Sequence, residues 1–444
     1  MRLRKFMAAA AVATFLVPGA VTLAEAQTQI QWWHAMGGEL GAKLEEIVEN
    51  YNKSQDQYQV VPTYKGSYPE TMTAAIAAFR AGQQPHIVQV YEVGTGTMMA
   101  AKGAVYPVYQ LMQDAGAEFD PSAFLPAVVG YYTDTDGNML SMPFNSSTPI
   151  LYYNKDVFEK AGLDPEQPPK TWADVEAFSK KIMESGAAPC GFTTGWISWV
   201  QLENLSAWHN QPIGTLENGF GGLGAELTFN GPVQVKHWTN LKKWQDEGIF
   251  QYGGPVGGDD APPKFYAQEC AIYMNSSASR AGVVANAKDF EVGYGMLPYY
   301  DDVEGAPQNS IIGGATLWVL MGHEDEEYKG VADFFNYLSS PEVQAEWHQF
   351  SGYLPITQAA YELGQSQGFY EKNPGTDVAI KQITLNEPTP NSKGLRFGNY
   401  VQIRDIIDEE FEQLLSGNKS PQEALDAVVE RGNALLREFE DTNG

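Results

Sequence analysis

The chain has 444 residues, of which 43% are hydrophobic, and at roughly 150 residues per domain this length predicts two or three domains with substantial cores. Asp and Glu number 55 against 28 Lys and Arg, which gives a formal net charge of −27. A surface this acidic repels phosphate backbones and anionic lipids, so we expect neither a nucleic-acid partner nor a peripheral membrane role.

The first 26 residues have the form of a cleavable signal peptide. Basic residues at positions 2, 4 and 5 precede an apolar stretch from Phe6 to Leu23, and Ala24-Glu25-Ala26 fits a signal peptidase site. A transmembrane anchor is the alternative for this segment. We predict cleavage after Ala26 and a soluble periplasmic protein, because no later segment approaches the roughly 20 apolar residues of a membrane-spanning helix.

Short strands and helices alternate along the first part of the chain. The spacing of apolar residues predicts strands at 30–33, 60–64 and 86–91 and helices at 39–52, 71–81 and 95–101. This alternation is typical of a doubly wound parallel sheet, in which ligands bind beyond the carboxyl ends of the strands. We therefore look for a site in the segments that follow these strands, at 33–36, 65–68 and 92–94.

The middle and the end of the chain are mainly helical. Thr171 is a good N-cap with Asp174 in the first turn, which predicts a helix over 172–185. Further helices are expected near 232–247, 327–339, 341–349, 404–416 and 421–439. Between them lie the two cysteines, Cys190 and Cys270. They could form a disulfide in an oxidising compartment or remain two buried thiols, and the sequence leaves both possibilities open.

Several segments resemble a known family. The run YYNKDVFEKAGL from Tyr152 to Leu163, followed by PKTW at 169–172, resembles the signature of the large, maltose-binding-like extracellular solute-binding proteins of ABC importers. Segments 62–66, 89–94, 143–149, 306–309, 311–315, 352–357 and 393–396 resemble its periplasmic sn-glycerol-3-phosphate-binding branch. They are spread from end to end, so the resemblance covers nearly the whole chain after the signal peptide.

The resemblance implies a two-lobed α/β periplasmic-binding-protein fold with discontinuous lobes. Residues 27–146 with 314–352 would form lobe 1, and 147–313 with 353–444 would form lobe 2. The chain would cross the hinge near 144–149, 311–315 and 352–355, and closure of the lobes would bury a ligand in the cleft. The protein would act as a monomer and dock on ABC permease subunits that work with a cytoplasmic ATPase.

The resemblance also implies a phosphate-binding site of five residues. Arg396 would hold the phosphate with two parallel hydrogen bonds from its guanidinium group. Ser147 and Ser276 would contribute hydroxyls, Gly314 a backbone N–H and Tyr353 a phenol. From spacing alone, Arg396 would be a surface salt bridge and the others ordinary turn residues. The serine that adjoins each of the two chosen serines stays an open alternative.

Glu92, Tyr68 and two tryptophans would bind the rest of the ligand. A carboxylate repels phosphate, so Glu92 would face the glycerol hydroxyls together with Tyr68; an exposed acid at a helix start is the alternative. Trp196 and Trp199 would share one face if helical. They would flank the glycerol and could hold a choline group by cation–π contact, or they simply pack in the core.

Enzyme motifs are missing from the sequence. We find no G-x-S-x-G, Walker A or H-E-x-x-H motif, and the six histidines are scattered without metal-ligand spacing. We therefore predict a transport receptor, with no cofactor, metal or catalytic residue, for sn-glycerol-3-phosphate and glycerophosphodiesters such as glycerophosphocholine. The alternatives are a receptor for a neutral oligosaccharide and a secreted glycerophosphodiester hydrolase.

Overall fold

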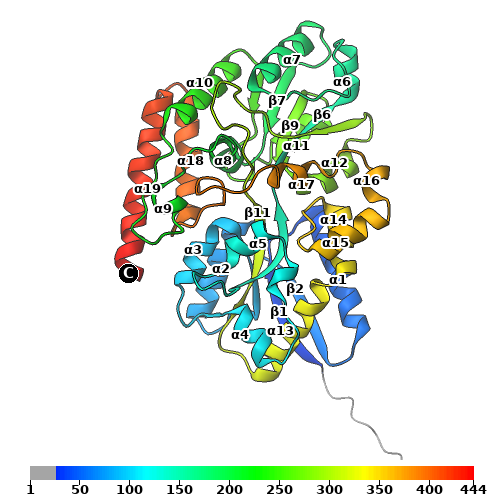
Figure 1. Ribbon diagram of the computed structural model, residues 1–444, viewed down its shortest axis with the longest axis vertical. Helices are drawn as coiled ribbons and strands as arrows, with labels where there is room; N and C mark the ends of the chain where they lie inside the picture. Colours follow the sequence, from blue (N-terminus) through cyan, green and yellow to red (C-terminus); the bar gives the residue numbers. More distant parts are fainter. Residues whose placement is uncertain (1–26) are drawn as a thin grey trace, which may run out of the picture.

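The protein consists of two lobes, each built around its own β-sheet (Figure 1). A computed structural model describes residues 27–444, so the predicted signal peptide and its cleavage site lie outside the described residues. The first sheet lies in the lower lobe of Figure 1 and the second sheet in the upper lobe. Within residues 27–444, every helix falls short of the length and apolarity that a bilayer crossing requires.

The first sheet has the strand order β2-β1-β3-β11-β4, and β5 also pairs with β11. Its parallel part consists of β1 (Thr28–His34), β2 (Tyr58–Tyr64) and β3 (Ile87–Tyr91), with α1 (Gly38–Ser54) and α2 (Tyr68–Arg80) between them. Its antiparallel part consists of β4 (Val105–Tyr106), β5 (Met142–Ser147) and β11 (Gly313–Leu320). The predicted parallel arrangement thus holds for the three N-terminal strands, whereas β11 enters from far along the chain in the opposite direction.

The second sheet has the order β10-β6-β9-β7-β8. Its strands are β6 (Pro149–Asn154), β7 (Cys190–Thr194), β8 (Phe250–Tyr252), β9 (Cys270–Ser276) and β10 (Val292–Gly295). Strand β7 is parallel to both β8 and β9, and Cys190 is the register partner of Cys270. The two cysteines form a disulfide, which decides between the two possibilities that the sequence left open.

The long helices begin and end within a few residues of their predicted positions. Helix α7 (Trp172–Glu184) starts with the expected cap, because the Thr171 hydroxyl accepts a hydrogen bond from the Asp174 N–H at 3.1 Å and the Asp174 carboxylate accepts one from the Thr171 N–H at 2.9 Å. The others are α10 (Pro232–Asp246), α13 (Asp325–Leu338), α14 (Pro341–Ser351), α18 (Tyr400–Leu415) and α19 (Pro421–Asn443). Helix α18 starts one turn before the predicted position, so Arg404 lies inside it.

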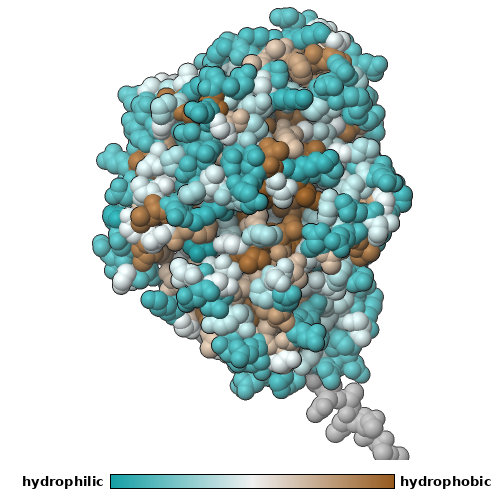
Figure 2. Space-filling model, in the orientation of Figure 1, coloured by the Kyte–Doolittle hydropathy of each residue, from teal (hydrophilic) through white to brown (hydrophobic). Residues whose placement is uncertain are grey.

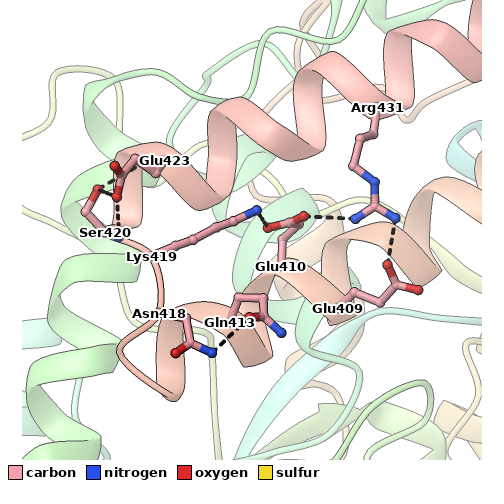
Figure 3. Close-up of polar contacts among 8 residues, drawn as sticks. All are labelled: Glu409, Glu410, Gln413, Asn418, Lys419, Ser420, Glu423 and Arg431. Carbon is pink, nitrogen blue, oxygen red and sulfur yellow. Dashed lines mark hydrogen bonds and ion pairs between the residues drawn. The ribbon is translucent and has the colours of Figure 1, made fainter.

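Helices α18 and α19 pack side by side at the edge of the molecule (Figure 1). Ion pairs join them: Arg431 of α19 contacts Glu409 at 2.7 Å and Glu410 at 2.8 Å, and Lys419 of the connecting turn contacts Glu410 (Figure 3). The Ser420 side chain caps α19 in a reciprocal box with Glu423. These contacts join α18 to α19 and to the turn between them.

Three segments meet where the chain passes between the lobes. Thr148 alone separates β5 of the first sheet from β6 of the second. Its hydroxyl donates to Ser310 Oγ at 2.6 Å and lies 3.1 Å from the Ile311 carbonyl. The Leu354 N–H donates to the Ser146 carbonyl at 2.7 Å. The three predicted hinge segments are therefore neighbours, which is the arrangement that a shared bending region requires.

Most charged side chains lie at the surface, and Figure 2 shows hydrophilic residues over most of the visible face. Within residues 27–444, the buried Asp, Glu, Lys and Arg side chains are Glu92, Glu203, Arg404, Asp408 and Glu410. All five lie on α18 or contact it. Buried charges are costly unless they are paired or serve a ligand, so this helix marks the place where a site is expected.

Candidate functional site

The principal cavity has a volume of about 560 Å³ and is lined by residues of both lobes. The segments that follow β1 and β3 contribute Met36 and Glu92, and the start of α2 contributes Tyr68. These are the carboxyl ends of the parallel strands, where the sequence predicted a site. Residues after β7 and at the end of β9 line the opposite wall, so the cavity lies in the cleft between the lobes.

Most of the predicted site residues line this cavity. They are Tyr68, Glu92, Ser147, Ser276, Gly314, Tyr353, Trp196 and Trp199. The adjoining serines, Ser146 and Ser277, are buried and do not line it. The cavity therefore brings together residues separated by up to 285 positions in the chain, and it favours Ser147 and Ser276 over their neighbours.

Arg396 does not line the cavity, and the structure corrects the role expected for it. Its Nη2 donates to the carbonyls of Gly130 and Tyr131 at 3.2 and 2.8 Å. Its guanidinium carbon lies 4.3 Å from the centre of the Phe220 ring. The side chain thus stabilises a contact between its own segment and the end of α5 (Pro126–Tyr132). A phosphate in the cavity would have to bind another cation.

Arg404, in contrast, lines the cavity. Among the cavity-lining residues of 27–444, it is the one with a basic side chain. Its Nε and Nη2 donate to the two carboxylate oxygens of Glu203 at 2.8 and 2.6 Å, and Nη2 also donates to Glu92 at 2.6 Å. Its Nη1 has no hydrogen-bond partner within residues 27–444. The guanidinium is therefore held in a fixed orientation with donor capacity left over.

The sequence contained a signal for Arg404 that its interpretation missed. Tyr400, Ile403, Ile407 and Phe411 form the buried stripe of α18, and Arg404 falls on the same face. An arginine in the apolar stripe of a helix needs carboxylate partners or an anionic ligand. The resemblance instead implied Arg396, which lies eight positions earlier in the chain, before the start of α18.

Arg404 carries one positive charge but is paired with two carboxylates, those of Glu203 and Glu92. Burial raises the pKa of Glu92; the Arg404 guanidinium opposes this shift, and the Glu203 carboxylate adds to it. Burial alone would lower the pKa of Arg404, but Glu203 and Glu92 outweigh it and hold that pKa well above its ordinary value. Arg404 is therefore permanently charged, whereas Glu92 is the carboxyl that is poorly stabilised as an anion.

Two phenols of the cavity remain neutral hydrogen-bond donors. The Tyr68 ring stacks on Tyr91 with 5.2 Å between centroids, and its hydroxyl accepts a hydrogen bond from Asn145 at 3.1 Å. Burial raises the pKa of Tyr68 well above its ordinary value and raises that of Tyr353 as well. Both hydroxyls therefore keep their protons at neutral pH.

Trp196 and Trp199 both line the cavity, but the helical condition under which they would share one face is not met. Trp196 has a φ of 47°, and Trp199 is the first residue of a π-helix, η3 (Trp199–Glu203). Gly313 allows the Trp199 ring to approach the hinge, because a Cβ at this position would lie 2.3 Å from the ring. The tryptophans form an aromatic wall by this local backbone geometry rather than by helical periodicity.

Gly314 permits a close approach of backbone at the floor of the cavity. Its φ is +90°, and a Cβ there would lie 1.9 Å from the Asn145 carbonyl oxygen. A residue with a side chain would therefore disrupt the pairing of β5 with β11. Gly314, the adjoining Ser147 and Arg404 all line the same cavity, which therefore offers a backbone amide, a hydroxyl and a guanidinium to an anion.

A second polar cluster lies away from the cleft. The ligand atoms of His86, His323 and Glu327 lie within 4.8 Å of one another, although their positions in the sequence suggested no metal site. The Gln31 N–H donates to His86 Nδ1 at 3.0 Å, so the proton of the neutral ring is on Nε2, which lies 3.3 Å from a Glu327 oxygen. This tautomer offers no free lone pair to a metal, and the cluster is best described as a histidine–carboxylate contact.

Comparison with known proteins places the chain in a family. A family model described as bacterial extracellular solute-binding protein matches residues 46–377. The chain is 54% identical over 421 residues, 95% of each protein, to the sn-glycerol-3-phosphate-binding periplasmic protein UgpB of Yersinia pseudotuberculosis.

Solved structures have the same fold. The GacH receptor of Streptomyces glaucescens aligns with a TM-score of 0.77 at 19% identity, over 93% of this chain and 99% of that one. UgpB from Mycobacterium tuberculosis, solved in complex with glycerophosphocholine, aligns with a TM-score of 0.76 at 20% identity over the same shares. These comparisons confirm the predicted two-lobed fold class. The chain is a member of the bacterial extracellular solute-binding protein family.

Proposed function

We propose that this protein is the periplasmic binding component of an ABC importer for sn-glycerol-3-phosphate and glycerophosphodiesters. It captures the ligand in the cleft and delivers it, with the lobes closed, to permease subunits that work with a cytoplasmic ATPase. The observation that carries the proposal is the buried, oriented Arg404 in a cavity lined by neutral donors. The UgpB relative is named for binding sn-glycerol-3-phosphate in the periplasm.

The ligand's phosphate binds at the Arg404 end of the cavity in this proposal. Ser147, Ser276 and the backbone N–H of Gly314 add neutral donors, and Tyr353 adds a phenol. Hydroxyl and amide donors bind an anion without adding charge, which suits a site whose guanidinium is already shared with carboxylates. We also propose that the chain passes between the lobes at 146/147, 313/314 and 352/353. The protein would be a monomer that is exported by its signal peptide.

The glycerol end and a diester's head group face the aromatic wall. Tyr68 and Glu92 accept or donate hydrogen bonds to glycerol hydroxyls. Trp196 and a carboxylate oxygen of Asp259 both lie within 4 Å of the point where a Cβ on Gly257 would stand. An aromatic face next to a carboxylate is a suitable place for a quaternary ammonium group, and this supports glycerophosphocholine as a ligand.

The test is calorimetric titration of the parent and of Arg404→Ala with sn-glycerol-3-phosphate, glycerophosphocholine and maltose. Removal of one partner of a buried charge pair costs about 2 to 5 kcal/mol, so the variant should bind both phosphoesters roughly 30-fold to several thousand-fold more weakly. Arg404→Lys should recover part of the loss, because a point charge cannot reproduce the planar fork.

Arg431→Ala is the matched control. Arg431 also pairs with two carboxylates of α18, the exposed Glu409 and the buried Glu410, but outside the cavity. This variant should bind within about threefold of the parent. Equal affinity of the parent and Arg404→Ala would refute the proposal that the phosphate binds to Arg404. Heat of binding with maltose alone would favour an oligosaccharide receptor, and release of choline or glycerol would favour a hydrolase.

A further inference from the structure

The buried cluster beside the cavity already contains more carboxylates than cations. Arg404 pairs with Glu203 and Glu92, and the three residues are 5%, 0% and 4% exposed. Arg404 is the one base that lines the cavity within residues 27–444, so a bound phosphate adds one or two negative charges to a group whose net charge is already negative. Like charges at such short range cannot all remain ionised in a buried site.

Glu92 is better placed than Glu203 to lose its charge. Glu203 holds Arg404 with both carboxylate oxygens and does not line the cavity. Glu92 lines the cavity and holds Arg404 through a single oxygen. Neutralising Glu92 would free the Nη2 side of Arg404 for the ligand, while the fork to Glu203 keeps the guanidinium in position.

The ionisable groups around this cluster favour the same conclusion. Arg404, Asp405 and Asp408 come from α18, and Glu203 comes from η3. The remaining groups are phenols whose pKa burial raises, so they carry no charge: Tyr68, Tyr91, Tyr131, Tyr132, Tyr353 and Tyr400. Apart from Arg404, the described neighbours of Glu92 are acids or neutral phenols, so nothing else among them offsets an added anion.

We propose that Glu92 takes up one proton from solvent when the ligand's phosphate docks on Arg404. The phosphate replaces the Glu92 carboxylate as the partner of Nη2, and the incoming proton remains on the Glu92 carboxyl. Glu92 then stays in the cleft as a neutral group that can both donate and accept hydrogen bonds. The inference rests on the proposed function and adds to it that binding is linked to protons.

This linkage has a definite sign. The liganded protein holds Glu92 protonated, so binding raises the pKa of Glu92 above its value in the empty protein. At a pH below the pKa of Glu92 in the empty protein, the proton is already present, and the affinity does not depend on pH. Above it, each pH unit should weaken binding by up to about tenfold, because a proton must be captured together with the ligand.

Glycerophosphocholine separates this proton from protons on the ligand. A phosphodiester carries one fixed negative charge between pH 6 and 8.5, whereas a phosphomonoester has its own second pKa near 6. We would titrate the full-length mature protein with glycerophosphocholine at pH 8 in buffers of different ionisation enthalpy. The slope of the observed enthalpy against the buffer's ionisation enthalpy counts the protons taken up. We expect about 0.5 to 1 proton for the parent.

Two variants assign the proton. Glu92→Gln should give a slope near zero and an affinity that does not change with pH, whereas Asp408→Asn should keep the parent's slope because Asp408 does not touch the guanidinium. A slope of zero in the parent would overturn the inference even if no variant folded, and so would a Glu92→Gln variant with the parent's slope. Failure of both phosphoesters to bind at all would instead overturn the proposed function itself.

Discussion

Asp408 is a buried carboxyl with incomplete hydrogen bonding. It lies one helical turn after Arg404 in α18, and its Oδ2 accepts a hydrogen bond from the Val256 N–H at 2.7 Å. Its Oδ1 has no partner within the described residues. Burial raises the pKa of Asp408 to about 7, a shift that the hydrogen bond from Val256 and the Arg404 charge only partly oppose.

Because this pKa is higher in the folded protein than in the unfolded chain, Asp408 favours folding at low pH. That contribution is lost as the pH rises from about 4 through about 7. Asp408→Asn keeps an acceptor for the Val256 N–H and removes the titration. Between pH 5 and pH 8 the parent should lose about 2.5 kcal/mol more of its free energy of unfolding than the variant, as measured by urea denaturation.

Asp426→Asn is the control for this prediction. Asp426 lies on the exposed side of α19, so its replacement should leave the pH dependence of the parent unchanged. If Asp408→Asn follows the parent curve from pH 5 to pH 8, the Asp408 carboxyl is ionised in the folded protein throughout that range.

Two arginines illustrate what the sequence could not resolve at this scale. Arg396 and Arg404 are eight positions apart, and both donate hydrogen bonds to another element, but Arg404 is buried and Arg396 is partly exposed. The apolar stripe of α18 marks Arg404 as an arginine on a buried helix face. Which arginine meets the cavity depends on how α18 packs against η3, and the sequence does not show that packing. Ser147, Gly314 and Tyr353 lie within segments that resemble the family, and these three residues line the cavity. Arg396 ends another such segment and does not line it.

At the scale of elements, η3 explains why the aromatic wall was predicted with the wrong geometry. Gln201 in its middle is hydrogen-bonded to His237 at 2.9 Å and to Thr194 at 3.1 Å. These contacts join η3 to α10 and β7. The π-helical turn places Trp199 at the cavity and Glu203 against Arg404. A π-helix depends on such tertiary contacts, so periodicity in the sequence does not reveal it.

Regular helices with local caps were predicted well. Helix α7 allows a test of whether the cap fixes the start of the helix. Thr171→Ala removes the acceptor for the Asp174 N–H, so the free energy of unfolding should fall by about 1 kcal/mol. Thr171→Ser keeps the hydroxyl and should recover most of the loss. Denaturant unfolding of the three proteins measures the difference. Equal stability of the alanine variant and the parent would mean that packing of Trp172, and not the cap, fixes the start of α7.

At the scale of the whole molecule, the cleft is lined by both lobes, and the three segments predicted to form the hinge adjoin one another. A ligand that contacts both lobes favours the closed arrangement by its differential affinity. Small-angle scattering should therefore show a smaller radius of gyration when glycerophosphocholine saturates the protein. Arg404→Ala at the same ligand concentration should keep the radius of the empty protein. An unchanged radius in the saturated parent would contradict hinge closure.

The strand order of the first sheet constrains when this protein can fold as it emerges from a ribosome or a translocation channel. Strand β3 ends at Tyr91, but its partner β11 begins at Gly313, and α13, which packs on β1, ends at Leu338. An N-terminal fragment that stops before these elements leaves one edge of β3 and one face of β1 uncovered. The first lobe therefore cannot complete its core until about three quarters of the chain has been delivered, because its sheet needs contacts between residues far apart in the sequence.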